Sequence, residues 1–542
     1  MRKWVCIFCG VVCLGFNSLA RGADFQVDNS IALQVALFAA GGNGQDDTIT
    51  LAPGEYNTVW TGTFNYTPIS IENRSLTLIG AGPDQTILDG IGIDQIFKID
   101  TTGLTTDSGA DISFQGMSFR NGNTPDFGAG LSILTNDADV RVEDCNFESN
   151  VSAFVPPPGS SQSIGGSGLF AWAIKSGDVS VIHSRFSKNS APQASGAGSF
   201  TIAVQGDMVL EGNTYIDNSA VPPGGFADTF GGGAAVVAVD GGLIINGNTF
   251  LNNFAGSGGG GLLTVAVNGT GLITNNIIAG NLITSSNPST PEQTGGGGLS
   301  MVVPLGSVAL TNNTITDNRA IGAPAGGLFV YQAVTQAAMV TAFNNIIWGN
   351  SAAPGSLCAD SCNDIRVMDD VDLDNKGASF TISHSDFSDI SFQCVSPACT
   401  PDQHVDVASN LDENPLFLSP GQDDFHLADN SNLIDKGDPL APGLPPEDFD
   451  GEARIQGAAP DMGAFEFVVS EGGGGEGGSN GGGGTGGGAE GQGSGGSGGC
   501  TLGTGPHQGT LFPGTALGLT LMGLFFLGRH RTVKKSQTPQ GR

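Results

Sequence analysis

A large apolar residue followed three positions later by asparagine recurs along the middle of the chain. The motif ends at seven asparagines spaced 28 to 39 residues apart: Asn150, Asn189, Asn218, Asn253, Asn281, Asn318 and Asn350. A glycine run and then an aliphatic run follow in most periods, as in GGGGLLTVAV from Gly258 to Val267. A period of this length, with an apolar residue at fixed spacing, predicts stacked structural repeats rather than a linker.

Each period holds short runs of β-branched and aliphatic residues and almost no helical pattern, so helical repeats do not fit. Asparagine tolerates a left-handed backbone, and stacked asparagine amides can hydrogen-bond from one coil to the next. Glycine supplies positive φ where the chain turns between sheets. The apolar residue before each asparagine would stack on its equivalents in a continuous core. The pattern therefore predicts an all-β fold, a parallel β-helix with the seven asparagines in one column.

The segments FESN, FSKN and FLNN, with GGGAAV between them, resemble the repeats of polymorphic outer membrane proteins. Over about Phe25 to Phe467 the chain resembles the right-handed, pectin-lyase-like β-helix more broadly. The resemblance implies a right-handed solenoid, and its short motifs specify the fold rather than an activity.

The start of the predicted solenoid contains a short helical segment. Ser30 to Ala39 is an apolar run that Asp28 or Asn29 can cap and that Gly41-Gly42 can end. We expect a short amphipathic helix that covers the first coil, because an uncovered solenoid end invites aggregation.

Three sequence blocks close the solenoid, beginning at Asn414, Asp448 and Pro460. They resemble the closing segment of bacterial choice-of-anchor Q surface proteins, which an interchangeable anchoring device follows. Four acidic residues in these blocks are candidate metal ligands: Asp448, Asp450, Asp461 and Glu466. One interpretation is a Ca²⁺ site, because carboxylates are the hard oxygen ligands that Ca²⁺ prefers. The other, which we favour, is that aspartate and glycine form turns that cap the last coil.

The N-terminus has the pattern of a secretory signal over residues 1–23. Arg2 and Lys3 precede an apolar core, and a small-x-small cleavage site ends at Ala20. We therefore expect the export machinery to be a partner and the mature protein to lie outside the inner membrane.

The C-terminus has the pattern of an anchoring or sorting tail. A Gly-rich linker ends in Gly498, Gly499 and Cys500, and an apolar stretch from Leu511 to Gly528 precedes four basic residues. Such a linker is a flexible coil, and about 18 apolar residues are close to the minimum for one membrane helix. A permanent single-pass anchor is one interpretation. The tail also resembles the sorting signals that rhombosortase- and myxosortase-type proteases cut in Gram-negative bacteria, and we favour sorting to the cell surface or the medium.

Six cysteines follow the signal. Cys145 lies two residues before an apolar motif position and is expected to be a buried hydrophobic residue. An exported protein can form disulfides, and the candidates are Cys358, Cys362, Cys394 and Cys399. Three connectivities are open, and a zinc site is a less favoured alternative.

Acidic residues dominate the chain, with 52 Asp and Glu against 20 Lys and Arg and a net charge of −32. This charge argues against a nucleic-acid partner, because phosphate binding requires the opposite sign. An extracellular glycan or protein ligand remains open.

A catalytic site of the lyase type would need a base beside Ca²⁺ ligands on one sheet face. The nearest groups are Arg141, Glu143 and Asp144 on one coil and Arg185 and Lys188 on the next, and we interpret them as ion pairs between coils. We predict an exported, surface-displayed, non-catalytic protein that acts as an adhesin, glycan binder or envelope spacer. The alternative is a Ca-dependent polysaccharide lyase or glycoside hydrolase.

The predicted organisation has seven parts. They are the signal (1–23), cap and first coils (24–110), repeat region (111–350), Cys-containing irregular coils (351–408), terminal block (409–467), Gly-rich linker (468–500) and hydrophobic tail (501–542).

Overall fold

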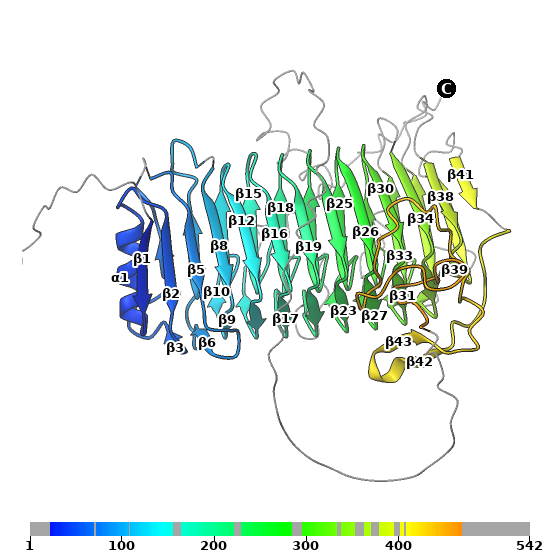
Figure 1. The fold of residues 1–542 in the computed structure, drawn as a ribbon, viewed down its shortest axis with the longest axis horizontal. Coiled ribbons are helices and arrows are strands. Elements are labelled where there is room, and N and C mark those ends of the chain that lie inside the picture. Colours follow the sequence, from blue (N-terminus) through cyan, green and yellow to red (C-terminus); the bar gives the residue numbers. More distant parts are fainter. Residues whose placement is uncertain are drawn as a thin grey trace, which may run out of the picture.

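The chain winds through three parallel sheets, one strand in each sheet per coil, in a computed structural model (Figure 1). The structure describes residues 22–69, 72–107, 109–154, 164–221, 229–284, 295–332, 338–352, 363–369, 379–394, 402–405 and 408–468. Every strand of the three sheets pairs in parallel with its equivalents in the neighbouring coils. The protein is a right-handed parallel β-helix, which confirms the predicted fold class.

Sheet A has thirteen strands: β1 (Ala23–Val27), β2 (Asp47–Leu51), β5 (Leu76–Ile79), β8 (Asp111–Gln115), β12 (Asp139–Glu143), β16 (Val179–Ile182), β19 (Met208–Glu211), β22 (Leu243–Asn246), β26 (Thr270–Thr274), β30 (Ser307–Thr311), β34 (Met339–Phe343), β38 (Ser379–Ser383) and β41 (Asp402–Val405). Sheet B has eleven short strands: β3 (Gly54–Asn57), β6 (Thr86–Asp89), β9 (Ser118–Arg120), β13 (Asn146–Glu148), β17 (Arg185–Ser187), β20 (Thr214–Ile216), β23 (Thr249–Leu251), β27 (Ile277–Ala279), β31 (Thr314–Thr316), β35 (Ile346–Trp348) and β39 (Asp386–Phe387).

Sheet C also has eleven strands: β4 (Phe64–Tyr66), β7 (Phe97–Asp100), β11 (Leu131–Thr135), β15 (Leu169–Ala173), β18 (Ser199–Ala203), β21 (Ala234–Ala238), β25 (Leu262–Ala266), β29 (Leu299–Val302), β33 (Leu328–Gln332), β37 (Ile365–Asp369) and β40 (Ile390–Cys394). Short strands between sheets B and C form two small parallel sheets, β10 (Asn123–Thr124) with β14 (Val151–Ser152), and β24 (Phe254–Ala255), β28 (Leu282–Thr284), β32 (Arg319–Ile321) and β36 (Ser351–Ala352).

The apolar residue of each repeat motif points into the core. Phe147, Phe186, Tyr215 and Phe250 are fully buried, with neighbouring ring centroids 4.6 to 4.8 Å apart and the ring planes within 5° of parallel. This spacing matches the distance between neighbouring strands, so the rings stack because the coils do.

The predicted N-terminal helix is α1 (Ser30–Ala40), and it covers the first coils at one end of the rod (Figure 1). Of the two candidate caps, Asn29 is the one used, since its side chain accepts a hydrogen bond from the Ala32 N–H at 2.9 Å. Gly41 ends the helix, as predicted. The expectation of amphipathicity is wrong, because the outward face of α1 is also apolar.

The terminal block, residues 409–467, doubles back and packs on the outer face of sheet B. It contains β42 (Phe417–Ser419), the 3₁₀ turn η2 (Pro420–Gln422) and β43 (Asp424–Leu427). Phe425 and Phe465 join a buried apolar cluster with Leu251 and Ile277 of β23 and β27. The block therefore covers the flank of the rod over several coils rather than only its last coil.

Candidate functional site

The seven motif asparagines lie in one column at the turn after sheet B. Each side-chain amide donates to the Oδ1 of the next asparagine at 2.9 to 3.0 Å, and the backbone N–H donates to the same oxygen. Asp364 ends the column by accepting from the Asn350 amide at 3.0 Å. Burial raises the pKa of Asp364 to about 6.

A second asparagine column lies at the turn before sheet B, and the sequence analysis missed it. It comprises Asn213, Asn248, Asn276, Asn313 and Asn345, joined by amide hydrogen bonds of 2.9 to 3.0 Å. The signal was present, because each of these residues stands two positions before the apolar motif residue, as in NTFLNN from Asn248 to Asn253. The full motif is thus asparagine, one residue, apolar residue, two residues, asparagine.

A third set of asparagines points outward and holds the terminal block. Asn275, Asn312 and Asn344 each precede a member of the second column and adopt a left-handed backbone with φ of 55° or 56°. The Asn312 amide donates to the carbonyls of Asp461 and Gly463, both at 2.9 Å. Asn344 exchanges two hydrogen bonds with the backbone of Asp438. Consecutive Asn-Asn pairs therefore mark the coils on which the block docks.

The four candidate metal ligands lie in this block and accept hydrogen bonds from the protein itself. Asp448 accepts the N–H groups of Asp450, Glu452 and Glu466, at 2.8 to 3.0 Å. Asp461 accepts those of Asp435 and Phe467 at 2.7 and 2.6 Å. Within the described residues there is no group of three or more His, Cys, Asp or Glu side chains arranged to hold a metal ion.

Arg454 is the residue at the centre of the block. It forms an ion pair with Glu466 at 3.0 Å, with both side chains at most 2% exposed. It also donates to the Oδ1 of Asn275 and to the carbonyl of Ala464. Burial lowers the pKa of Arg454, and burial raises that of Glu466 to about 8. A buried arginine thus joins the block to the rod across 179 residues of sequence.

His426 stands at the edge of a groove of about 280 Å³ between the block and strands β23 and β27. Its two ring nitrogens contact Asp424 at 2.7 Å and Asp450 at 2.8 Å. Burial by itself lowers the pKa of His426, but the two carboxylates outweigh it and the pKa is raised. His426 is not among the site residues expected from the sequence. The sequence D-F-H from Asp424 to His426 indicates the contact with Asp424, because alternate residues of a strand lie on the same face.

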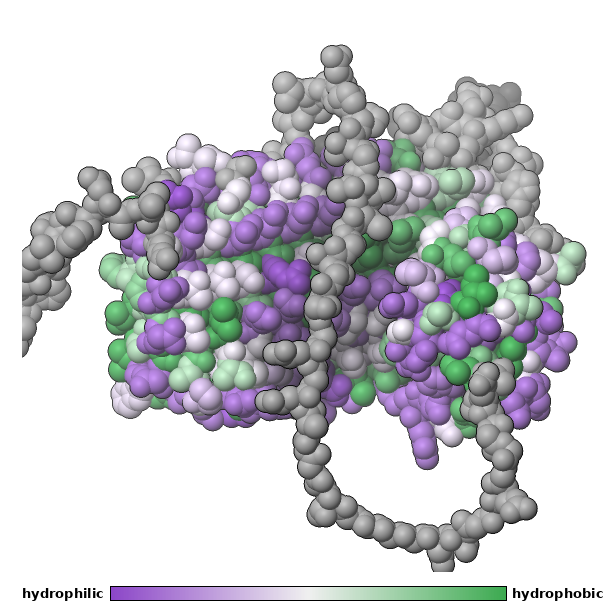
Figure 2. Space-filling view, in the orientation of Figure 1, coloured by the Kyte–Doolittle hydropathy of each residue, from purple (hydrophilic) through white to green (hydrophobic). Residues whose placement is uncertain are grey.

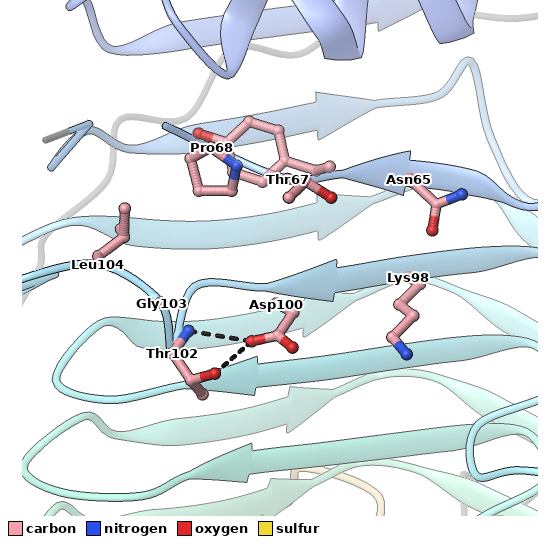
Figure 3. Close-up of a pocket in the computed structure, with 9 residues that line it drawn as sticks. Asn65, Thr67, Pro68, Lys98, Asp100, Thr102, Gly103 and Leu104 are labelled. Carbon is pink, nitrogen blue, oxygen red and sulfur yellow. Dashed lines mark hydrogen bonds between the residues drawn. The ribbon is translucent and has the colours of Figure 1, made fainter. Parts of the chain in front are cut away.

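A larger groove, of about 520 Å³, lies on the outer face of sheet C near its N-terminal end (Figure 3). Lys98 lies opposite Asn65 of the neighbouring strand, and Asp100 accepts hydrogen bonds from the backbone and hydroxyl of Thr102. These groups can hydrogen-bond a polar ligand. The polar surface is short, because the position equivalent to Lys98 becomes Ser132 and then Phe170 in the next two coils.

The predicted ion pairs between coils of the repeat region are not formed among the residues that the structure describes. Arg141 pairs with Glu143 of its own strand at 3.0 Å. The register places Arg185 opposite Asn146, so the aligned partner of this arginine is not acidic.

Several predicted sites lie outside the described residues. These are Ala20, Cys358, Cys362, Cys399, Gly498, Gly499, Cys500 and the apolar stretch from Leu511 to Gly528, and only the backbone of Cys394, in β40, is described. Cys145 is a free, buried cysteine, and burial raises the pKa of its thiol to about 12. No helix in the described ranges is long and apolar enough to cross a membrane.

Comparison with protein-family models and with curated protein sequences finds no match. Several solved structures are similar, and two of them are described here. Pectate lyase Pel9A is 13% identical with a TM-score of 0.35, and the similarity covers 82% of this chain and 97% of that one. The A-module of the mannuronan C-5 epimerase AlgE6 from Azotobacter vinelandii is 14% identical with a TM-score of 0.24, over 72% of this chain and 97% of that one. These likenesses concern the β-helical fold alone.

Proposed function

We propose that this protein is an exported, surface-displayed, non-catalytic β-helix that presents a rigid rod to a glycan or protein ligand. In the proposal, the C-terminal tail sorts the rod to the cell surface or the medium, with a sorting protease as partner.

The observation that carries the proposal is the rigidity of the body. Sheet A has thirteen strands, and the spacings between neighbouring strands, about 4.8 Å each, add up to a rod roughly 58 Å long. Two buried asparagine columns join its coils, and the terminal block fastens to its flank through Arg454 and the outward asparagines. A long body whose coils are joined by buried hydrogen bonds suits a display role, in which shape and surface act rather than a reacting group.

The charged groups of the terminal block support the same proposal. Asp448, Asp461, Glu466 and Arg454 are all less than 10% exposed and are hydrogen-bonded to one another or to backbone. Carboxylates that accept backbone N–H groups at this burial stabilise a turn, and they leave few lone pairs for a ligand. These residues act in assembly of the rod.

Two assays on one preparation test the proposal. Residues 24–470 are screened on a glycan array, and the same protein is incubated with acidic polysaccharides and Ca²⁺ while the absorbance of unsaturated products is followed. We expect glycan or protein binding without product. Ca-dependent product formation would contradict the proposal and establish the alternative, a β-helical polysaccharide lyase. Appearance of reducing ends without unsaturation would establish a hydrolase.

A further inference from the structure

The outward face of α1 is apolar although it lies at the molecular surface. Ile31 and Val35 are each 62% exposed and Phe38 is 85% exposed. Their spacing of four and three residues places them on one stripe of the helix. Ile69, which is 51% exposed, lies beside Gly42 at the C-terminal end of the helix. Figure 2 shows hydrophobic residues at the end of the rod where Figure 1 places α1.

This stripe is not needed to close the solenoid. The opposite face of α1 does that, with Leu33, Ala36, Leu37 and Ala40 all at most 4% exposed. A helix that only covers a rod end would be polar on its other face. A helix that is apolar all round is typical of one buried on both sides, so the stripe indicates a second packing partner.

Charge indicates what the partner is. The chain carries 52 acidic residues against 20 basic ones, so two copies repel each other over most of their surfaces. The helix SIALQVALFAA contains no charged residue at all. It is therefore a place where two copies can meet without bringing like charges together. A lipid surface fits less well, because helices that lie on membranes carry Lys or Arg beside their apolar face.

We propose that the protein forms a two-fold, head-to-head dimer in which the Ile31–Val35–Phe38 stripe of one copy packs on the same stripe of a second copy. Such a contact needs only one self-complementary patch, and a short uncharged apolar stripe provides it. An eleven-residue helix is about 16 Å long, so the buried area is at most about 1,000 Å², the range of weak interfaces. The dimer is therefore concentration-dependent. It places two rods in line and doubles the number of ligand-binding surfaces.

The test is sedimentation velocity of the full chain, purified as the producing cells release it, over a range of concentrations and salt. We expect a monomer–dimer equilibrium that strengthens as salt rises, because screening reduces the repulsion between the acidic bodies. The double variant Val35→Gln/Phe38→Gln should raise the dissociation constant at least about tenfold. The matched control is Leu440→Gln, which replaces an apolar side chain that is 87% exposed on the terminal block, and it should leave the equilibrium unchanged.

A cross-linking variant tests the symmetry directly. Val35→Cys should give a disulfide-linked dimer through the two introduced cysteines, and Leu440→Cys should not. Equal thermal unfolding midpoints for all variants would show that the fold is intact. A monomer at every concentration in high salt would overturn the proposal, as would a dimer that persists in the Val35→Gln/Phe38→Gln variant. Flotation with phosphatidylcholine vesicles that this variant abolishes would assign the stripe to a lipid surface and also overturn it.

Discussion

At the scale of single residues, each ladder asparagine uses its full hydrogen-bonding capacity inside the rod. Asn253 is completely buried, and its amide donates to the carbonyl of Tyr215 and to the Oδ1 of Asn281. Its own Oδ1 accepts both the backbone N–H and the amide of Asn218. An apolar replacement therefore removes the partner of the Asn218 N–H and one partner of the Tyr215 carbonyl on the preceding coil, whereas the Asn281 Oδ1 keeps the backbone N–H of residue 253.

We predict that Asn253→Leu lowers the free energy of unfolding by about 1–3 kcal/mol, the cost of leaving buried donors unsatisfied. Urea unfolding followed by circular dichroism measures it. The control is Asn252→Gly, because Asn252 is exposed and has a φ of 54° that glycine adopts easily. A neutral Asn253→Leu variant would show that the column does not stabilise the rod.

The ion pair of Arg454 leads to a second prediction. Arg454→Met leaves Glu466 as an uncompensated buried carboxylate, and removal of one partner of such a pair costs about 3–5 kcal/mol. The double variant Arg454→Met/Glu466→Gln should recover a large part of that loss, because no buried charge remains. Urea unfolding measures how far each variant lowers the free energy of unfolding. Equal decreases in the single and the double variant would contradict a dominant role for the ion pair.

At the scale of elements, the last coils contain buried carboxylates where earlier coils have asparagine or apolar residues. Asp386 in β39 is fully buried, and burial raises its pKa to about 7. The hydrogen bond from the Glu413 N–H opposes this rise in pKa, and charge repulsion from Asp412, Asp364 and Glu413 contributes to it. The end of the rod is therefore sensitive to protonation, whereas the middle coils are joined by neutral amides.

We predict that these coils are more stable at pH 5 than at pH 8. An aspartate with a pKa raised in the folded state binds more protons when folded, so its contribution is present at low pH and is lost as pH rises towards 7. The free energy of unfolding is expected to decrease by about 1–3 kcal/mol between pH 5 and pH 8. Burial shifts the pKa of Asp47 in the same direction, to about 6. Urea unfolding at the two pH values measures the difference, and Asp386→Asn should reduce it. Equal stability at both values would contradict the prediction.

At the scale of the whole molecule, the described rod is followed by a Gly-rich stretch, Gly-Gly-Cys, an apolar stretch and a basic cluster. In the proposed sorting, the Gly-rich stretch separates the rod from the tail in sequence. Folding of the β-helix and sorting of the tail are therefore expected to be separable by mutation.

We predict that the mature surface or secreted protein lacks about its last 40 residues, since an apolar stretch of about 18 residues followed by basic residues suits an inner-membrane intermediate. Intact-mass analysis of surface and medium fractions measures the C-terminus. Cys500→Ala should leave the precursor in the inner membrane with its β-helix folded, whereas Thr485→Ala in the same linker should be processed normally. A chain that ends at Arg542 in the inner membrane would refute sorting.

Sequence by itself determined the features that repeat from coil to coil. The spacing of Phe250 and Asn253, seen again in every period, was enough to predict the parallel β-helix and the placing of the ladder asparagines, because each stacks on a copy of itself one strand away. Asn29 caps the start of α1 and Gly41 ends it, as their local chemistry requires. Such features depend on residues close in sequence or related by the repeat period.

Tertiary structure alone decided where the segments that do not repeat, above all the terminal block, lie on the rod. Nothing local relates Arg454 to Asn275, or Asp461 to Asn312, because these partners are 149 residues or more apart and do not repeat. Asp448, Asp461 and Glu466 accept backbone N–H groups, and His426 contacts Asp450, because separate segments of the terminal block pack on one another. The exposure of Phe38 was likewise invisible in the helix sequence, since which face of an all-apolar helix meets solvent depends on what packs against it.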